Sequence, residues 1–265
     1  MRFLGNGQRS DHQTIPPIDQ VGVSERPIGD PYRRTHWTNA GPAEIVAVQH
    51  KGGFTLRLPK SLIDGHSRFR NEVHAADRGR YLQLAELGQT PTAMVIACCD
   101  ARVDVSAIFD TEPGALFIVR NVANLVPPYE PEGKYHGTSA ALEFAAIGLK
   151  VPNVIVLGHS HCGGVDAYRQ RVRDHVQEHG FIGSWLTLLD DLDVVESDIF
   201  AYGDEMAFEL AAIRSSLVNL RTFPFVKKRE ESGLLALHGL HFDLGSGELL
   251  ALEQESGRFL ALTET

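Results

Sequence analysis

Two short stretches carry residues whose types and spacing suit metal chemistry. The first is residues 98–102, with the sequence CCDAR, and the second is residues 159–162, with the sequence HSHC. Thiolate and imidazole are the preferred ligands of Zn²⁺, a tetrahedral ion of intermediate softness. Cys98, His159 and Cys162 would supply three ligands and leave the fourth position open, as in catalytic rather than structural zinc sites. The pattern therefore predicts a catalytic zinc centre.

The two adjacent cysteines are expected to differ in role. Side chains alternate along an extended chain, so Cys98, Asp100 and Arg102 can share a side that excludes Cys99. We therefore predict Cys98 as the ligand and interpret Cys99 as a packed or neutral thiol. The alternative is less specific. Buried cysteines are often small apolar residues, His159 can simply end a strand, and Asp100 with Arg102 can form an ordinary surface ion pair.

Two predicted strands would position these residues. Residues 92–97 and residues 154–157 are short apolar runs that end just before the two stretches. Such runs are typical of buried parallel strands. Sites in open α/β sheets form at the carboxyl ends of the strands. Two neighbouring strands would therefore bring Cys98, His159 and Cys162 to one place.

The surrounding pattern predicts helices on either side of this sheet. Residues 115–119 indicate a further strand, and residues 137–150 indicate a helix that crosses over to the strand at residue 154. Residues 205–220 have an amphipathic pattern. Another helix is expected to open at Cys162, because the glycines after it let backbone N–H groups approach the site and a helix N-terminus favours a thiolate. The predicted fold class is α/β, with a central, mainly parallel β-sheet flanked by helices.

The two ends of the foldable region carry weaker signals. Apolar residues recur at helical spacing between residues 62 and 87. Residues 234–237 and residues 249–252 predict a terminal strand pair, because a turn sequence lies between them. His238 and His241 lie in that pair, and we interpret both as structural.

The composition is that of an ordinary globular protein. The chain has 265 residues and a net charge of −9, which argues against nucleic acid as a partner. Three cysteines cannot form a disulfide framework, and thiolate ligands suit a reducing compartment, so we expect a cytoplasmic protein. No apolar run approaches the roughly 20 residues of a membrane helix.

The N-terminal part differs from the rest. Residues 1–55 are interrupted by prolines and show no sustained helical or strand period. We expect a loosely ordered arm there, followed by the catalytic domain at residues 56–265. No apolar run follows the first two residues, and acidic residues argue against a transit peptide, so no targeting segment is expected.

At the two metal-binding stretches the sequence resembles a known family, the β-class carbonic anhydrases. The family's zinc signature, Cys-x-Asp-x-Arg followed by His-x-x-Cys-Gly-Gly, is present at residues 98–102 and 159–164. Further blocks similar to the family's occur in the family's order at residues 113–114, 117–128 and 137–143. An ordered series of blocks is a far more specific signal than one short motif.

The resemblance implies both an activity and an assembly. Zinc held by Cys98, His159 and Cys162 would catalyse the reversible hydration of carbon dioxide to bicarbonate and a proton through a zinc-bound hydroxide, the reaction of a carbonate dehydratase, which is a lyase. Asp100, kept ionised by Arg102, would orient that hydroxide because an ionised carboxylate only accepts hydrogen bonds. We expect a homodimer or a dimer of dimers, with no nucleic-acid or membrane partner.

The resemblance also implies the residues that line the substrate pocket. Gln89 and Phe117 match pocket positions of the plant-like subgroup, whose site stays open, and Gly163 follows the ligand Cys162. Phe144 stands where plant relatives have a tyrosine, so the pocket wall is kept but a hydroxyl is lost. We expect an open site at neutral pH, with Gln89 hydrogen-bonding carbon dioxide or bicarbonate.

Several alternatives stay open. Asp100 could be a fourth zinc ligand, as in the closed, inactive state of some family members, although the bicarbonate-binding residues of that subgroup are not recognisable. His161 could shuttle the released proton, because imidazole titrates near physiological pH. The scaffold could instead hydrolyse carbon disulfide or carbonyl sulfide, or bind zinc or bicarbonate without catalysis. Intact Asp100, Arg102 and Gln89 argue against a purely structural site.

Overall fold

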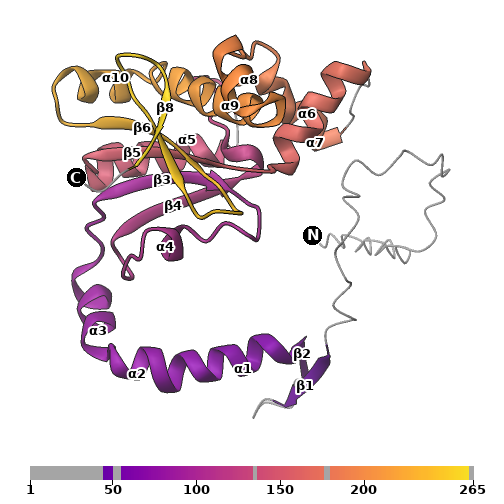
Figure 1. Ribbon diagram of the computed structural model, residues 1–265. Helices are drawn as coiled ribbons and strands as arrows, with labels where there is room; N and C mark the ends of the chain where they lie inside the picture. The colour runs from indigo at the N-terminus through magenta and orange to yellow at the C-terminus, as the bar shows by residue number, and fades with distance from the viewer. Residues whose placement is uncertain (1–43, 50–54, 134–135, 176–179, 263–265) are drawn as a thin grey trace, which may run out of the picture. The chain divides into compact units, whose positions relative to one another are not determined.

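The computed structural model describes residues 44–49, 55–133, 136–175 and 180–262 (Figure 1). The chain divides into two compact units, Met1–Thr38 and Asn39–Thr265, and the first lies outside the described residues. Most of the predicted N-terminal arm therefore lies outside them too. Near its end, β1 (Ile45–Gln49) pairs antiparallel with β2 (Thr55–Pro59), a hairpin that the sequence pattern does not predict.

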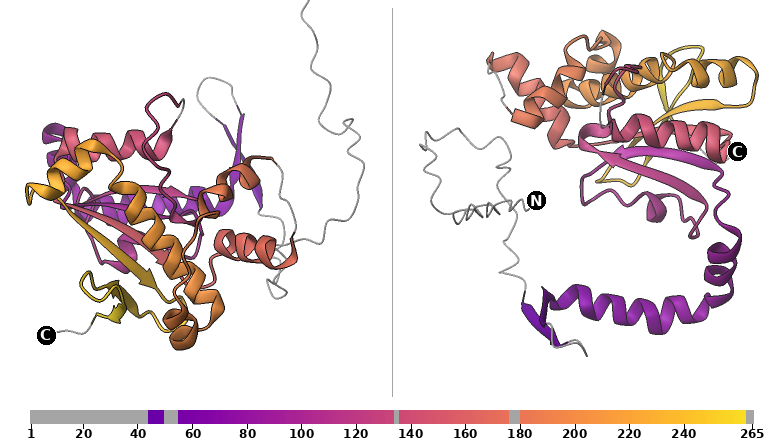
Figure 2. Two further views of the ribbon diagram at one scale, coloured as in Figure 1. Left: turned by 90° about the horizontal axis from the view of Figure 1, so that it is seen from above. Right: turned by 180° about the vertical axis from the view of Figure 1, so that it is seen from behind.

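A six-stranded sheet organises the second unit (Figures 1 and 2). Its order is β4-β3-β5-β6-β7-β8, with the first four strands parallel and the last two antiparallel to their neighbours. The strands are β3 (Ala93–Cys98), β4 (Leu116–Asn121), β5 (Asn153–His159), β6 (Ala236–Phe242), β7 (Leu249–Leu252) and β8 (Phe259–Ala261). The predicted fold class is confirmed: an α/β protein whose mainly parallel sheet is flanked by helices.

The strand register brings the two chemical stretches to one edge of the sheet. Cys98 ends β3 and pairs with Asn121, the last residue of β4. Ala97 pairs with Leu157 of β5, two residues before His159 ends that strand. β3 is buried along its whole length, as its apolar sequence predicts. Because these strands run in the same direction, their carboxyl ends lie together.

Helices bury the two faces of the sheet. Met94, Ile96 and Val156 pack against one helical layer, and Val95 and Ala97 pack on the opposite face with the short α4 (Val105–Ile108). The helical layer consists of α5 (Gly137–Glu143), the π-helical η4 (Phe144–Leu149), α9 (Asp204–Leu220) and α10 (Pro224–Glu231). The remaining helices after the first strand of the sheet are η3 (Val122–Asn124), α6 (Gly163–Asp174), α7 (Gly180–Leu186), η5 (Thr187–Leu189) and α8 (Glu196–Tyr202).

The predicted helices at residues 137–150 and 205–220 are confirmed, with one difference. The first changes from α to π geometry at Phe144, which a search for a 3.6-residue period does not distinguish. One face of this helix is buried, with Leu142, Ala145 and Ala146 in the core.

The helical segment before the sheet leaves its apolar side chains exposed. It consists of α1 (Lys60–Arg68), η2 (Phe69–Val73), α2 (His74–Ala76) and α3 (Arg78–Leu87), and none of their residues is buried. Leu62 is 64% exposed and Leu87 is 76% exposed. Even so, no helix of the described residues is long and apolar enough to cross a membrane.

The terminal strand pair differs from its prediction. β7 occupies the predicted residues, but β6 starts at Ala236 instead of Leu234 and runs on to Phe242. β6 also pairs in parallel with β5, so it belongs to the main sheet. The apolar run ends at Leu237, whereas the strand continues through His238 and His241, which the prediction assigned to the same strand pair.

Candidate metal centre

Three ligand-type side chains meet at the carboxyl edge of the sheet. Cys98 ends β3, His159 ends β5, and Cys162 is the N-cap residue of α6. Their ligand atoms all lie within 4.8 Å of one another. The three residues are 5%, 0% and 2% exposed. The structure therefore brings together the three ligands that the sequence predicts.

The geometry of this cluster fits Zn²⁺. The two sulfur atoms lie 3.9 Å apart, and two sulfurs about 2.3 Å from a tetrahedral zinc would lie about 3.8 Å apart. His159 Nδ1 donates to the carbonyl oxygen of Ser160 at 2.9 Å, which directs Nε2 into the cluster. Nε2 is buried and has no hydrogen-bond partner among the described residues. A buried nitrogen without a partner is costly, and a metal ion would satisfy it.

A hydrogen bond between the two thiols shifts their pKa values in opposite directions. A hydrogen bond from Cys162 is the largest cause that lowers the pKa of Cys98 to about 4. The same hydrogen bond, together with burial, raises the pKa of Cys162 well above its ordinary value. Because a metal binds cysteine as thiolate, metal binding at this pair would be coupled to proton release.

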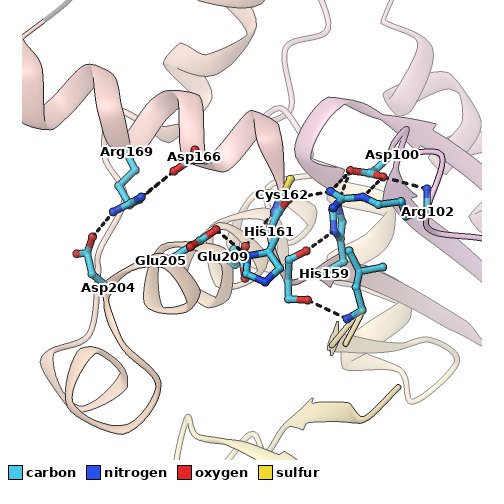
Figure 3. A network of polar contacts seen from close by, with 12 residues as sticks. Asp100, Arg102, His159, His161, Cys162, Asp166, Arg169, Asp204, Glu205 and Glu209 are labelled. Carbon is cyan, nitrogen blue, oxygen red and sulfur yellow. Dashed lines mark hydrogen bonds and ion pairs between the residues drawn. The ribbon is translucent and has the colours of Figure 1, made fainter. Parts of the chain in front are cut away.

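Asp100 and Arg102 form a two-bonded ion pair beside the cluster (Figure 3). Arg102 donates from Nε to Oδ1 at 2.9 Å and from Nη2 to Oδ2 at 2.6 Å. This hydrogen bonding lowers the pKa of Asp100 to about 2. Oδ2 of Asp100 lies 4.0 Å from His159 Nε2, so an ionised carboxylate borders the predicted metal position.

Arg102 and Arg120 tie together the turns that carry the ligands. Arg102 Nη2 also donates to the carbonyl oxygen of His161, at 2.9 Å. Arg120, at the end of β4, donates to the carbonyl oxygens of Cys98 and Asp100 at 2.8 and 2.6 Å. Arg120 is not among the predicted site residues, although a basic residue directly after the apolar run of a predicted strand indicates a residue at the carboxyl edge of the sheet.

Two buried polar residues behind Cys162 were also missed. The backbone N–H of Cys162 donates to Glu209 Oε1 at 3.0 Å. Glu209 Oε2 lies 2.9 Å from His241 Nε2. The sequence indicates only a structural role for His241. Glu209 interrupts the buried face of α9, and an acidic residue in that position is the signal that sequence analysis passed over.

Three of the predicted pocket residues lie away from the metal cluster. Phe117 pairs with Met94, four residues before the end of β3, which is roughly 13 Å along the strand. Phe144 contacts Phe117, with ring centroids 5.7 Å apart. Gln89 precedes β3 and therefore lies beyond the end opposite Cys98. Within one chain, the structure does not bring these three residues to the site.

Other predicted neighbours of the ligands do lie at the site. Gly163 is the first residue of α6, and a Cβ added there would meet nothing within 4 Å, so the space beside Cys162 is open. His161 is exposed, and its Nδ1 lies 3.0 Å from Glu205 Oε1. Cys99 is exposed and outside the cluster, so it is not a packed thiol.

The fold and the site define an α/β protein with a buried Cys₂His centre at the carboxyl edge of its sheet. The sequence model of the carbonic anhydrase family matches residues 93–249. A carbonic anhydrase from Pseudomonas aeruginosa is 35% identical over 209 residues, covering 77% of this chain and 92% of the relative. The chain therefore belongs to the carbonic anhydrase family, and its structural neighbours place it in the β class.

Two solved structures support that placement. The β-carbonic anhydrase CcaA has a TM-score of 0.65 and 31% identity, with 77% of this chain and 92% of that chain covered. A tetrameric β-carbonic anhydrase from the ascomycete Sordaria macrospora has a TM-score of 0.60 and 25% identity, with 76% and 98% covered. The chain is thus an enzyme of the carbonic anhydrase type.

Proposed function

We propose that the protein catalyses the zinc-dependent, reversible hydration of carbon dioxide to bicarbonate and a proton. The observation that carries the proposal is the Cys98, His159 and Cys162 cluster, with its unpartnered His159 Nε2 directed inward and an ionised Asp100 at its border. When bound, Zn²⁺ lowers the pKa of a coordinated water from 15.7 to about 7 and so supplies hydroxide at neutral pH. Three protein ligands leave the position that this chemistry needs.

Asp100 orients the nucleophile and does not act as a fourth ligand. Both of its oxygens already accept hydrogen bonds from Arg102, which hold the carboxylate in place. As an anion, Asp100 only accepts hydrogen bonds. It would therefore hold the hydrogen of the attacking hydroxide toward itself, which leaves a lone pair of that hydroxide facing the substrate. This arrangement supports an open site at neutral pH. A metal-loaded structure near neutral pH with Asp100 bonded to zinc would contradict it.

A second copy of the chain completes the substrate pocket. Gln89, Phe117 and Phe144 lie toward the end of β3 opposite Cys98, so within one chain they are too far from the metal to contact its substrate. The apolar side chains of α1 to α3 are exposed on this single chain, which supports an apolar partner surface. We infer a homodimer that exchanges these pocket residues. The tetrameric state of the Sordaria macrospora enzyme supports pairing of such dimers.

We propose that the protein is cytoplasmic, because thiolate ligands suit a reducing compartment. All three cysteines are free, and the ligand pair Cys98 and Cys162 is buried with its sulfurs in contact. Oxidation of this pair would remove two of the three ligands. A reducing environment keeps both available to the metal.

Stopped-flow hydration of carbon dioxide, followed with a pH indicator, tests the function. Metal content is measured by mass spectrometry on the same sample. We expect rates well above buffer with about one zinc per chain. Cys162→Ala should abolish both zinc and activity, whereas Cys99→Ala is the matched control, because Cys99 is exposed and outside the cluster.

Two results would separate this function from its alternatives. Full zinc occupancy without hydration between about pH 7 and pH 9 would reject the proposal, because zinc-coordinated water should be ionised there. Hydrolysis of carbon disulfide or carbonyl sulfide by that same sample would then identify the other substrate class. Absence of all three activities would indicate a protein that only binds zinc.

A further inference from the structure

A buried carboxylate lies directly behind the ligand Cys162 and has no part in the proposed chemistry. Glu209 is 3% exposed and sits on the buried face of α9, next to Leu210 and Ala212. Its Oε1 accepts a hydrogen bond from the backbone N–H of Cys162 at 3.0 Å. Figure 3 shows Glu209 close to Cys162 and to His161.

His241 of β6 holds the other carboxylate oxygen. His241 is fully buried, and its Nε2 lies 2.9 Å from Glu209 Oε2. Its Nδ1 has no hydrogen-bond partner in the part of the chain that the structure describes. Glu209 is therefore the polar group that orients this ring there. A continuous polar chain runs from β6 through α9 to the residue that carries the ligand sulfur.

Packing alone does not account for these buried hydrogen bonds. A buried carboxylate and imidazole carry a desolvation cost that apolar residues of similar size avoid. The first N–H groups of a helix have no acceptor within the helix, and Cys162 stands where α6 begins. The side chain of Cys162 makes no capping hydrogen bond, since its sulfur faces Cys98. Glu209 supplies an acceptor while leaving that sulfur available to a metal.

We propose that Glu209 is a positioning residue of the metal centre, which fixes the backbone of Cys162 and is itself fixed by His241. The inference rests on the proposed zinc function. Fixing the backbone N–H of Cys162 limits the positions that its sulfur can take relative to Cys98 and His159. Less conformational freedom of Cys162 is then lost when the metal binds. Removing outer partners of metal ligands typically lowers metal affinity ten- to a hundredfold.

Zinc affinity, measured by competition with a chromophoric chelator, tests the inference. Glu209→Met keeps the length of the side chain but removes the acceptor, and Glu209→Gln keeps an acceptor oxygen without the charge. Asp198→Asn is the matched control, because Asp198 is another buried carboxylate and pairs with Arg214 at 2.6 Å. We expect Glu209→Met to weaken zinc binding ten- to a hundredfold, Glu209→Gln to recover most of it, and Asp198→Asn to match the wild type.

Cobalt substitution adds a readout that general destabilisation would not move. The thiolate-to-cobalt absorption band should shift in Glu209→Met and stay unchanged in Asp198→Asn. If Glu209→Met does not fold, the double variant Glu209→Met/His241→Leu carries the same expectation, because it leaves neither partner buried alone. Equal zinc affinity and equal cobalt spectra in the Glu209→Met protein and the control would overturn the inference. A wild-type chain that binds no zinc would instead overturn the proposed function.

Discussion

A mixed dimer of two impaired variants can show whether each active site is built from two copies of the chain. One variant is Gln89→Ala, which keeps the metal cluster, and the other is Cys162→Ala, which keeps the pocket residues. β3 runs five residue steps from Ala93 to Cys98, about 17 Å, and Gln89 lies beyond its far end. This separation far exceeds the roughly 3 Å of a hydrogen bond. Gln89 can thus serve the metal site of its partner but not its own.

The expected recovery follows from the symmetry of a dimer. A mixed dimer has one site with both defects and one site with neither, so a purified mixed dimer should show about half of the wild-type activity per chain. Gln89→Ala alone should lose a hydrogen bond to an oxygen that becomes negatively charged as bicarbonate forms, about 1.5–3 kcal/mol. That loss corresponds to roughly ten- to a hundredfold in kcat/KM. The activity of the mixed dimer should therefore be well above the average activity of the two single variants.

The assay uses two different affinity tags, co-expression and sequential purification, so that only mixed dimers are measured. Carbon dioxide hydration is then followed by stopped flow. The control pairs Gln89→Ala with Phe117→Ala: both defects lie on the contributed side of the pocket, so every site of the mixed dimer carries one of them. Activity of the Gln89→Ala and Cys162→Ala dimer no higher than the parental average would refute the shared site.

Two further predictions concern protons. Arg102 holds the pKa of Asp100 at about 2 instead of its ordinary 3.8, so the pair should stabilise the fold above about pH 4 and lose that contribution as the pH falls toward about 2. In denaturant titrations the stability gap between wild type and Arg102→Gln should shrink by about 2 kcal/mol over this range, and a constant gap would speak against it. His161→Ala should lower turnover in weak buffer and recover in concentrated imidazole, because an exposed imidazole can carry protons to solvent; unchanged turnover in weak buffer would exclude His161 as the shuttle.

The metal cluster was predictable because local sequence signals agree there with a rule of topology. Two apolar runs each end at a ligand, and parallel strands that are neighbours place their ends together. Alternation along an extended chain then selected Cys98 over Cys99, in agreement with the structure. Each step needed only a few consecutive residues. The sequence therefore contains the ligand set almost explicitly.

The support of the cluster was not predictable in this way. Glu209 and His241 lie far from Cys162 in sequence, and no residue next to either of them indicates that they contact each other or Cys162. Hydrophobic periodicity marks the buried face of α9 but cannot say which strand end that face meets. The same limit applies to β6: its apolar run shows neither where the strand ends nor that it pairs with β5.

The hydrogen bonds around the cluster join the ligand-bearing turns to neighbouring segments of the fold. Arg102 joins the turn after β3 to the turn before α6 through Asp100 and the carbonyl oxygen of His161. Arg120 holds the turn after β3 from β4, and Glu209 holds the backbone of Cys162 from α9. Each ligand-bearing turn is thus fixed by a charged side chain from another segment, and the ligand atoms stand within 4.8 Å of one another. Arg102 therefore has two effects at the site: its hydrogen bonds join the two turns, and its charge keeps Asp100 ionised and so an acceptor of hydrogen bonds.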